Sequence, residues 1–256
     1  MWRVSSAVAS HPGLRREENE DSFSVRPELG LYLVADGMGG HAAGEVASRL
    51  AVETIEAFID DTNGADVDRT WPFPYDPGLS LDGNRLKAAL RLANRRIAST
   101  VERDPALKGM ATTAAVLLAG RDSLTVAHVG DSRVDRRRGG VMEQVTVDHS
   151  WVSEQVRAGS LTEADAKQHP WRNVVTRALA GGDDPEVDVT ALDVRAGDLF
   201  MVCSDGLTGV VSDEACQAII TAAPTLQRAC ADLIAAANAG GGPDNITVAL
   251  LKIDVE

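Results

Sequence analysis

Four aspartates stand beside apolar runs that have the character of β-strands: Asp36, Asp131, Asp205 and Asp244. Three of them follow such a run and adjoin a glycine, and the fourth precedes the run Ile246–Ile253. Moving a carboxylate out of water is costly unless it is paired or binds a cation. Oxygen ligands without Cys or His suit a hard cation such as Mg²⁺ or Mn²⁺.

The same pattern has a plainer interpretation. Asp-Gly is a common two-residue hairpin turn, and a single instance usually indicates nothing more. The glycine also permits a tight turn and lets a ligand approach the backbone. From the pattern alone, a cation site and a set of turns both stay open as interpretations.

The runs that must carry these aspartates are short, apolar and mostly bounded by Gly or Asp, as strands are. They are Ser22–Val25, Leu31–Ala35, Thr113–Leu118, Leu124–Val129, Val141–Val145, Val187–Leu192, Leu199–Cys203 and Ile246–Ile253. Consecutive strands favour antiparallel sheets, and paired helices favour outer layers.

Helix-period patterns occupy the stretches between the groups of strands. They are Ala42–Ile59, Arg85–Val101, Thr162–Lys167, Asp213–Ala222 and Thr225–Ala237. Thr162 and Ser212 are the expected N-caps of two of these helices. Residues 60–83 are rich in Asp, Pro and Gly and are expected to form a long loop. Because no stretch reads as a linker, we expect a single catalytic domain over residues 1–256.

The formal net charge of −13 argues against a nucleic-acid partner, because DNA affinity depends on cations that neutralise phosphates. It also argues against binding to an anionic membrane surface. The N-terminus lacks the apolar core of a signal peptide, and no apolar run approaches the length of a membrane span. The three cysteines have no metal-binding spacing and are expected to be reduced. A cytoplasmic monomer is the resulting expectation.

Seven short motifs occur in an order that resembles the metal-dependent protein phosphatases, the phosphatase 2C (PPM) family, in its bacterial form. They are Arg16–Asp21, Val34–His41, Gly109–Ala114, Val129–Arg133, Asp148–Ser150, Cys203–Leu207 and Gly242–Val248. The resemblance covers almost the whole chain. It implies an α+β fold, a four-layer α-β-β-α sandwich of two antiparallel sheets flanked by helix pairs. It also implies that residues 148–182 form a flap beside the active site.

The resemblance implies a ligand set for Mn²⁺ or Mg²⁺. Asp36 would bridge two ions, and Gly37 would bind one of them through its carbonyl oxygen. Asp205 and Asp244 would complete the ligands of the other ion. Asp131, together with Asp205, would hold a third ion.

Four more residues receive roles by the same resemblance. Glu20 and Asp21 would order metal-bound waters or contact an ion directly, and Arg16 would grip the substrate phosphate. Some family members carry a histidine directly after the Asp-Gly pair as a proton donor. Here that position is Met38, so His41 is the nearest substitute, unless it is only a solvated residue at a helix start.

The implied activity is hydrolysis of phosphoserine and phosphothreonine. Two divalent ions that share a water lower its pKa, which gives a hydroxide for direct in-line attack on phosphorus. The expected partners are phosphorylated proteins, the substrates of a cognate Ser/Thr kinase. A specialised phosphoprotein regulator, such as an anti-sigma antagonist, stays open as the substrate of the same centre.

Two further alternatives and one surface feature remain. Gly37, Gly39 and Ala42 match a dinucleotide-binding fingerprint loosely, although that fold needs a second strand ending in an acidic residue. A pseudophosphatase that binds without chemistry would lack a metal ligand, yet all four aspartates are present. The arginine-rich run Val134–Arg138 is expected to form an exposed hairpin.

Overall fold

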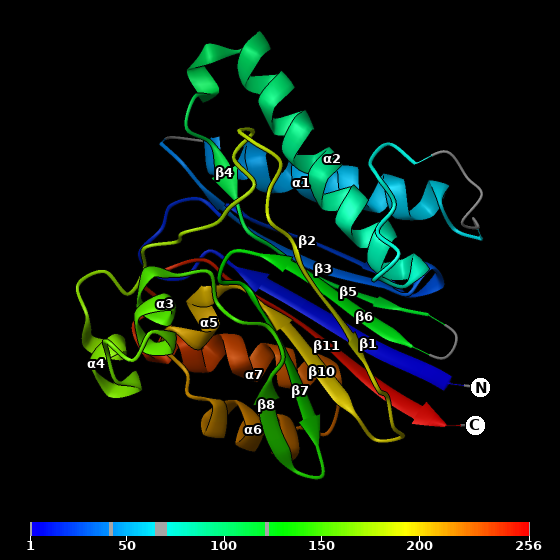
Figure 1. Cartoon of the computed structure of the whole chain (residues 1–256). Coiled ribbons are helices and arrows are strands. Elements are labelled where there is room, and N and C mark those ends of the chain that lie inside the picture. The colour runs from blue at the N-terminus through cyan, green and yellow to red at the C-terminus, as the bar shows by residue number, and fades with distance from the viewer. Residues whose placement is uncertain (1, 41–42, 65–70, 121–122, 256) are drawn as a thin grey trace.

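The computed structural model describes residues 2–40, 43–64, 71–120 and 123–255. Two β-sheets lie face to face between two layers of helices (Figure 1). All strand pairs in the described sheets are antiparallel. The expected four-layer α-β-β-α sandwich is therefore confirmed. The dinucleotide-binding alternative is wrong, because that fold requires a parallel sheet.

The first sheet has the strand order β1-β11-β10-β7-β8. Its strands are β1 (Trp2–His11), β7 (Arg133–Arg138), β8 (Val141–Gln144), β10 (Leu199–Cys203) and β11 (Ile246–Val255). The sequence pattern missed β1, because its small and hydroxylated residues give only weak alternation. β1 pairs with β11 along its whole length, from Trp2 opposite Val255 to His11 opposite Ile246.

The second sheet has the strand order β2-β3-β5-β6-β9. Its strands are β2 (Asp21–Arg26), β3 (Leu31–Met38), β5 (Ala114–Ala119), β6 (Leu124–Val129) and β9 (Asp188–Leu192). The short strand β4 (Ala111–Thr112) pairs with the end of β3. Because of this pairing β3 continues two residues beyond Asp36, which lies within the strand and not at its end as the pattern predicted.

The helices of the described chain are α1 (Ala43–Asp61), α2 (Leu81–Arg103), α3 (Trp151–Arg157), α4 (Glu163–Gln168), α5 (Asp205–Thr208), α6 (Asp213–Ala222) and α7 (Leu226–Ala239), with 3-10 turns at Pro27–Leu29 and Pro105–Leu107. The four longer helices α1, α2, α6 and α7 form the two outer layers, whereas α3 and α4 lie at one end of the sandwich (Figure 1). α1 and α2 pack on the second sheet, and α6 and α7 pack on the first. The pattern missed the short helices α3 and α5.

Helix starts follow the capping chemistry predicted from the sequence. The hydroxyl of Thr162 accepts a hydrogen bond from the Asp165 N–H at 3.1 Å, and that of Ser212 accepts one from the Ala215 N–H at 3.3 Å. Each hydroxyl satisfies one of the N–H groups that a helix start leaves without a partner. Both predicted N-caps are confirmed.

Strand alternation explains why the interior becomes polar at one end. On β3, Leu31 and Leu33 face the helix pair, whereas Tyr32 and Val34 face the other sheet. The period of two places Asp36 on the same side as Tyr32 and Val34. The interior rows of β5, β10 and β11 likewise change from apolar to hydroxyl side chains. We call this set of inward positions the polar end of the sandwich: Asp36, Thr113, Ser204 and Thr247.

The run Val134–Arg138 does form one strand of a hairpin, because Arg138 lies opposite Val141 across the turn at Gly139 and Gly140, but the predicted exposure is wrong. The run belongs to β7, which lies between β10 and β8, and Val134 and Asp135 are buried. Arg138 forms a bidentate ion pair with Asp198, at 2.7 and 2.8 Å. Arg136 and Arg138 are accommodated because carboxylates on neighbouring elements pair with them, whereas Arg137 donates to the Thr221 hydroxyl.

The described part of the chain contains no helix that combines the length and the apolar character needed to cross a membrane.

Candidate metal centre

Five aspartates form a cluster at the polar end of the sandwich, in which the other four lie within electrostatic range of Asp36. They are Asp21, Asp36, Asp131, Asp205 and Asp244. Asp21 lies directly opposite Asp36 in the β2–β3 pairing. Burial, followed by repulsion from the other four carboxylates, raises the pKa of Asp36 well above its ordinary value. The fold thus gathers four predicted ligands and one predicted water-ordering residue into one acidic cluster.

The same forces act on the other members of the cluster. Burial raises the pKa of Asp21, Asp131 and Asp205, and a neighbouring carboxylate raises each further. Such a group of like charges is unfavourable unless protons or cations neutralise it.

An unsatisfied oxygen supports a cation at this position. Oδ2 of Asp21 accepts a hydrogen bond from the Ser204 hydroxyl at 2.8 Å. Oδ1 of Asp21 is buried and has no hydrogen-bond partner among the described residues. Carboxylate oxygens are the preferred ligands of Mg²⁺ and Mn²⁺. The donor set and the orphaned oxygen therefore fit a divalent cation or its bound water.

The backbone around Asp36 is held firmly. Its N–H donates to the Thr113 hydroxyl at 3.0 Å, and its carbonyl accepts from the Thr113 N–H and the Thr112 hydroxyl, both at 2.9 Å. Gly37 donates its N–H to the Glu20 carbonyl at 3.1 Å. A Cβ on Gly37 would lie 2.1 Å from the Gly44 carbonyl oxygen, so only glycine fits here. Thr112 and Thr113 therefore hold the backbone of Asp36 in place.

Asn245 fastens the N-terminal motif to the segment that carries Asp244. Its side-chain amide donates to the carbonyls of Pro12 and Glu18, at 3.0 and 2.9 Å, and its side-chain oxygen accepts from the Glu20 N–H at 2.8 Å. The sequence reasoning assigned Asn245 no role, although it lies within a quoted motif. Because of this clamp, residues 228 positions apart meet, and Arg16 Nη2 lies 2.9 Å from Asp244 Oδ2.

The remaining predicted site residues lie at the rim or outside the described chain. Arg16 is half exposed, with 51% of its side chain accessible. Glu20 is partly buried, and burial raises its pKa. His41, the predicted proton donor, lies outside the described residues.

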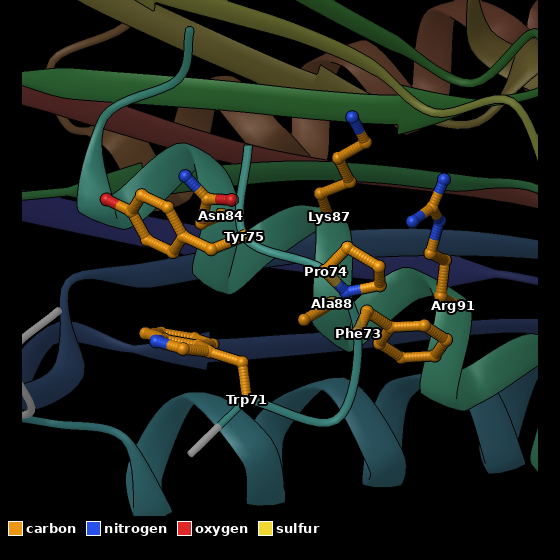
Figure 2. Close-up of a pocket in the computed structure, with 8 residues that line it drawn as sticks. All are labelled: Trp71, Phe73, Pro74, Tyr75, Asn84, Lys87, Ala88 and Arg91. Carbon is orange, nitrogen blue, oxygen red and sulfur yellow. The ribbon is translucent and has the colours of Figure 1, made fainter. Parts of the chain in front are cut away.

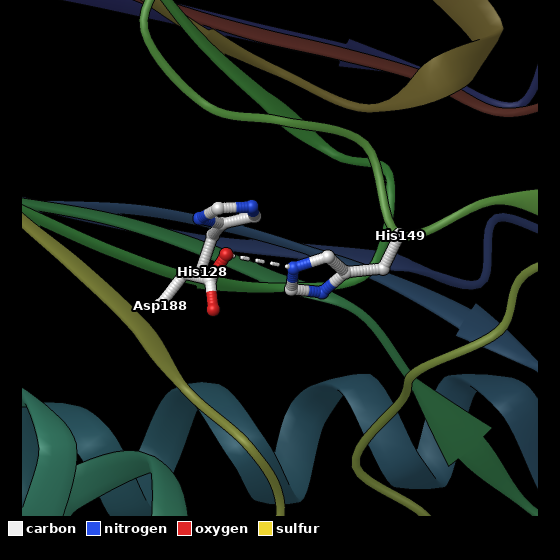
Figure 3. A group of neighbouring side chains, drawn as sticks. All are labelled: His128, His149 and Asp188. Carbon is white, nitrogen blue, oxygen red and sulfur yellow. Dashed lines mark hydrogen bonds and ion pairs between the residues drawn. The ribbon is translucent and has the colours of Figure 1, made fainter. Parts of the chain in front are cut away.

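A second group of side chains, which the sequence reasoning did not single out, lies on β6, on β9 and in the loop between β8 and α3. One donor atom from each of His128, His149 and Asp188 lies within 4.8 Å of the others (Figure 3). Nδ1 of His149 accepts the Gly130 N–H, so the ring proton of neutral His149 must sit on Nε2, which faces Asp188 Oδ2 at 3.2 Å. A metal would have to displace that proton, so a closed hydrogen-bond network explains the group better. The Asp148–Ser150 motif was the available signal.

A pocket on the helical layer is built differently. It lies between the loop that carries Trp71, Phe73 and Tyr75 and the first half of α2 (Figure 2). The Phe73 ring packs under the guanidinium of Arg95, 4.1 Å from the ring centroid. None of the predicted site residues lines this pocket, and its aromatic side chains fasten the loop onto the helix pair.

Comparison with known proteins gives one consistent result. A profile described as "Protein phosphatase 2C" matches residues 14–237. The serine/threonine protein phosphatase PstP of Mycobacterium tuberculosis is 39% identical over 247 residues, which are 96% of this chain and 44% of PstP. The serine/threonine phosphatase Stp of Listeria monocytogenes is 34% identical over 249 residues, 95% of this chain and 93% of Stp.

The structural comparison agrees. A crystal structure of the catalytic domain of PstP, in complex with 2 manganese ions, has a TM-score of 0.84 and 36% identity and covers 100% of both chains. This chain spans less than half the length of full-length PstP and nearly all of the Listeria protein.

Proposed function

Because the chain belongs to the protein phosphatase 2C family, we propose that it is a metal-dependent protein phosphatase that hydrolyses phosphoserine and phosphothreonine. The observation that carries this proposal is the convergence of five aspartates at the polar end of the sandwich. A cluster of that kind costs folding free energy in the absence of cations, so its presence is best explained by the ions it binds. The names of the relatives and the manganese-bound PstP structure support the same activity.

The proposed ligands are those of the acidic cluster. Asp36, Asp205, Asp244 and the Gly37 carbonyl would hold two Mn²⁺ or Mg²⁺ ions, with Asp36 as the shared ligand. Bound divalent ions would lower the pKa of a water for direct attack on phosphorus and offset charge on the phosphoryl oxygens. Asp131, together with Asp205, would hold a third ion.

The protein's own groups have the remaining tasks. Ser204 holds Asp21 in place, so that the orphaned oxygen of Asp21 stays directed at the cluster. Glu20, whose backbone supports Gly37, presents its carboxylate at the rim. Arg16 is already paired with Asp244 and half exposed, so its planar guanidinium is available to bind two oxygens of a phosphate at the cluster. His41 remains the proposed proton donor.

The substrates are phosphorylated proteins, and the opposing enzyme is a Ser/Thr kinase. A specialised phosphoprotein regulator would use the same centre. The deciding experiment measures hydrolysis of p-nitrophenyl phosphate and of a phosphothreonine peptide, with Mn²⁺ and after exhaustive treatment with EDTA. We expect activity that requires the metal and returns when Mn²⁺ is restored. Full activity after complete metal removal would contradict the proposal.

A further inference from the structure

His149 holds the turn that presents Asp131. The backbone N–H of His149 donates to the Gly130 carbonyl at 3.0 Å, and the Gly130 N–H donates to Nδ1 of the His149 ring at 3.1 Å. Both polar groups of Gly130 are therefore bound by one residue. His149 is buried, with 1% of its surface accessible, so no water competes for these bonds.

The opposite side of the same turn is also fixed. Gly130 has φ +106°, and a Cβ there would lie 2.6 Å from Cβ of Thr113. Thr113 in turn accepts the N–H of Asp36 through its hydroxyl. The Gly130 turn is thus wedged between a residue that orients Asp36 and the imidazole of His149. Asp131 follows Gly130 directly, so the direction of its side chain depends on both Thr113 and His149.

The far side of the ring is tied to the flap segment, residues 148–182. Nε2 of His149 lies 3.2 Å from Asp188 Oδ2 at the start of β9 (Figure 3). Nη1 of Arg177, in the flap segment, lies 3.4 Å from the other carboxylate oxygen of Asp188. The Thr176 N–H donates to the His149 carbonyl at 2.8 Å. The ring also stacks on His128, with centroids 4.6 Å apart. Both ends of the flap segment therefore meet at this residue.

We propose that His149 is a positioning residue that fixes the Asp131 turn and couples it to the flap segment. The proposal rests on the proposed function, because it assigns a cation to Asp131. The hydrogen bond from Gly130 to Nδ1 is the element that sets the affinity of this cation site. The Asp188 contact transmits the position of the flap to it. Partners of this kind, one step removed from a metal, typically alter metal affinity or activity by about 10- to 100-fold.

Two substitutions separate the two sides of the ring. In His149→Asn, the side-chain oxygen can still accept the Gly130 N–H, whereas the reach to Asp188 is lost. In His149→Gln, the longer side chain reaches Asp188 but puts a methylene where Nδ1 accepted. Mn²⁺ binding to the 256-residue chain would be measured by the electron paramagnetic resonance signal of unbound Mn²⁺. Phosphatase activity and the melting temperature of the metal-free protein would be measured in parallel.

We expect His149→Gln to bind its weakest Mn²⁺ ion about tenfold less tightly than wild type, and His149→Asn to stay within about threefold. The proposal is overturned if His149→Gln does not bind Mn²⁺ more weakly than His149→Asn. It is also overturned if the control His169→Asn, on the flap but without a contact to Gly130, weakens binding as much as His149→Gln.

A partly exposed position keeps the test decisive if a His149 variant fails to fold. Asp188→Ala leaves the buried ring in place, and we expect about threefold weaker Mn²⁺ binding, whereas unchanged binding would refute the coupling to the flap. A wild-type protein without Mn²⁺-dependent activity would instead reject the proposed function. Wild-type activity with unaffected variants would reject only the role of His149.

Discussion

Asp21 and Asp135 are both buried aspartates with one oxygen that has no hydrogen-bond partner among the described residues. Burial is the largest cause of a raised pKa at both positions. Their surroundings differ. Asp21 belongs to the cluster of five aspartates at the polar end, whereas Asp135 lies on β7 within electrostatic range of the buried thiols of Cys203 and Cys216.

The two sites show two different consequences of burying a carboxylate away from water. A lone buried carboxylate has an unfavourable desolvation free energy that nothing nearby offsets fully, although Arg133 lowers the pKa of Asp135 somewhat. Five carboxylates together are worse for the metal-free protein, but a divalent cation reverses the sign of their interaction. The cluster is therefore suited to bind ions, and Asp135 only costs stability.

The largest expected difference concerns activity. Asp36→Asn removes the proposed shared ligand, and we expect Mn²⁺-dependent turnover of p-nitrophenyl phosphate to fall on the order of 1000-fold, a loss of several kcal/mol of transition-state stabilisation. Asp135→Asn is the matched control, since it removes the same charge from another buried site, and its turnover should stay within about twofold. Comparable losses of turnover in both variants would show that the cluster and Asp135 do not differ in their importance for activity.

Metal binding should also raise the melting temperature of the protein. Mn²⁺ at about 100 times its dissociation constant stabilises the folded state by roughly 2.7 kcal/mol, which corresponds to a rise in melting temperature of about 5–10 °C. Differential scanning fluorimetry with Mn²⁺ and with EDTA would measure it. The rise should be much smaller in Asp36→Asn and unchanged in Asp135→Asn. A wild-type melting temperature indifferent to Mn²⁺ would contradict the cation site.

The pH dependence of the free energy of unfolding should reveal the free-energy cost of burying the Asp135 carboxylate. Its folded pKa is about 7, above the ordinary value of 3.8, so the folded state binds the proton more tightly. Wild type therefore loses stability relative to Asp135→Asn as pH rises from 4 to 8, by an amount on the order of 3 kcal/mol. Urea unfolding of both proteins across this range would measure it, with the exposed Glu102→Gln as the control. Parallel curves of unfolding free energy against pH for the two proteins would show that folding does not raise the pKa of Asp135.

The smallest expected effect is at the rim. Arg16→Ala removes the proposed phosphate contact but no metal ligand, so we expect KM for a phosphothreonine peptide to rise about tenfold while kcat changes less than threefold. Arg15→Ala is the control, because it removes an exposed arginine from the neighbouring position. A loss confined to kcat would give Arg16 a role other than substrate binding.

Much of the fold was accessible from local pattern. The strands Leu124–Val129 and Leu199–Cys203 and the helix Asp213–Ala222 have the predicted bounds, because apolar runs bounded by Gly or Asp mark the strands and a serine N-cap marks the helix. The sequence pattern did not predict β1, because this strand is stabilised by pairing with β11 over ten residues and not by its own hydrophobicity. β7 was misjudged because its arginines find carboxylate partners only in the folded chain.

Part of the candidate site was likewise predictable from the sequence, and part was not. The aspartates were visible because four of them stand beside apolar runs, a pattern that fits either a cation site or turns, and the family resemblance, now confirmed, supplied their proposed roles. Asn245 and His149 were not identified as functional, because their importance lies in contacts with Pro12, Glu18 and Gly130, which are distant in sequence.

The sequence by itself determined which residue types are available: carboxylates beside apolar strands, glycines where the chain must turn, and the side-chain alternation that any strand imposes. Only the tertiary structure decided that five aspartates share one cluster, that Asp135 stands apart from it, and that one histidine joins the Asp131 turn to the flap. The physical reason is that propensity and periodicity act over neighbouring residues, whereas repulsion, desolvation and hydrogen bonding depend on distances that exist only once the two sheets have packed together.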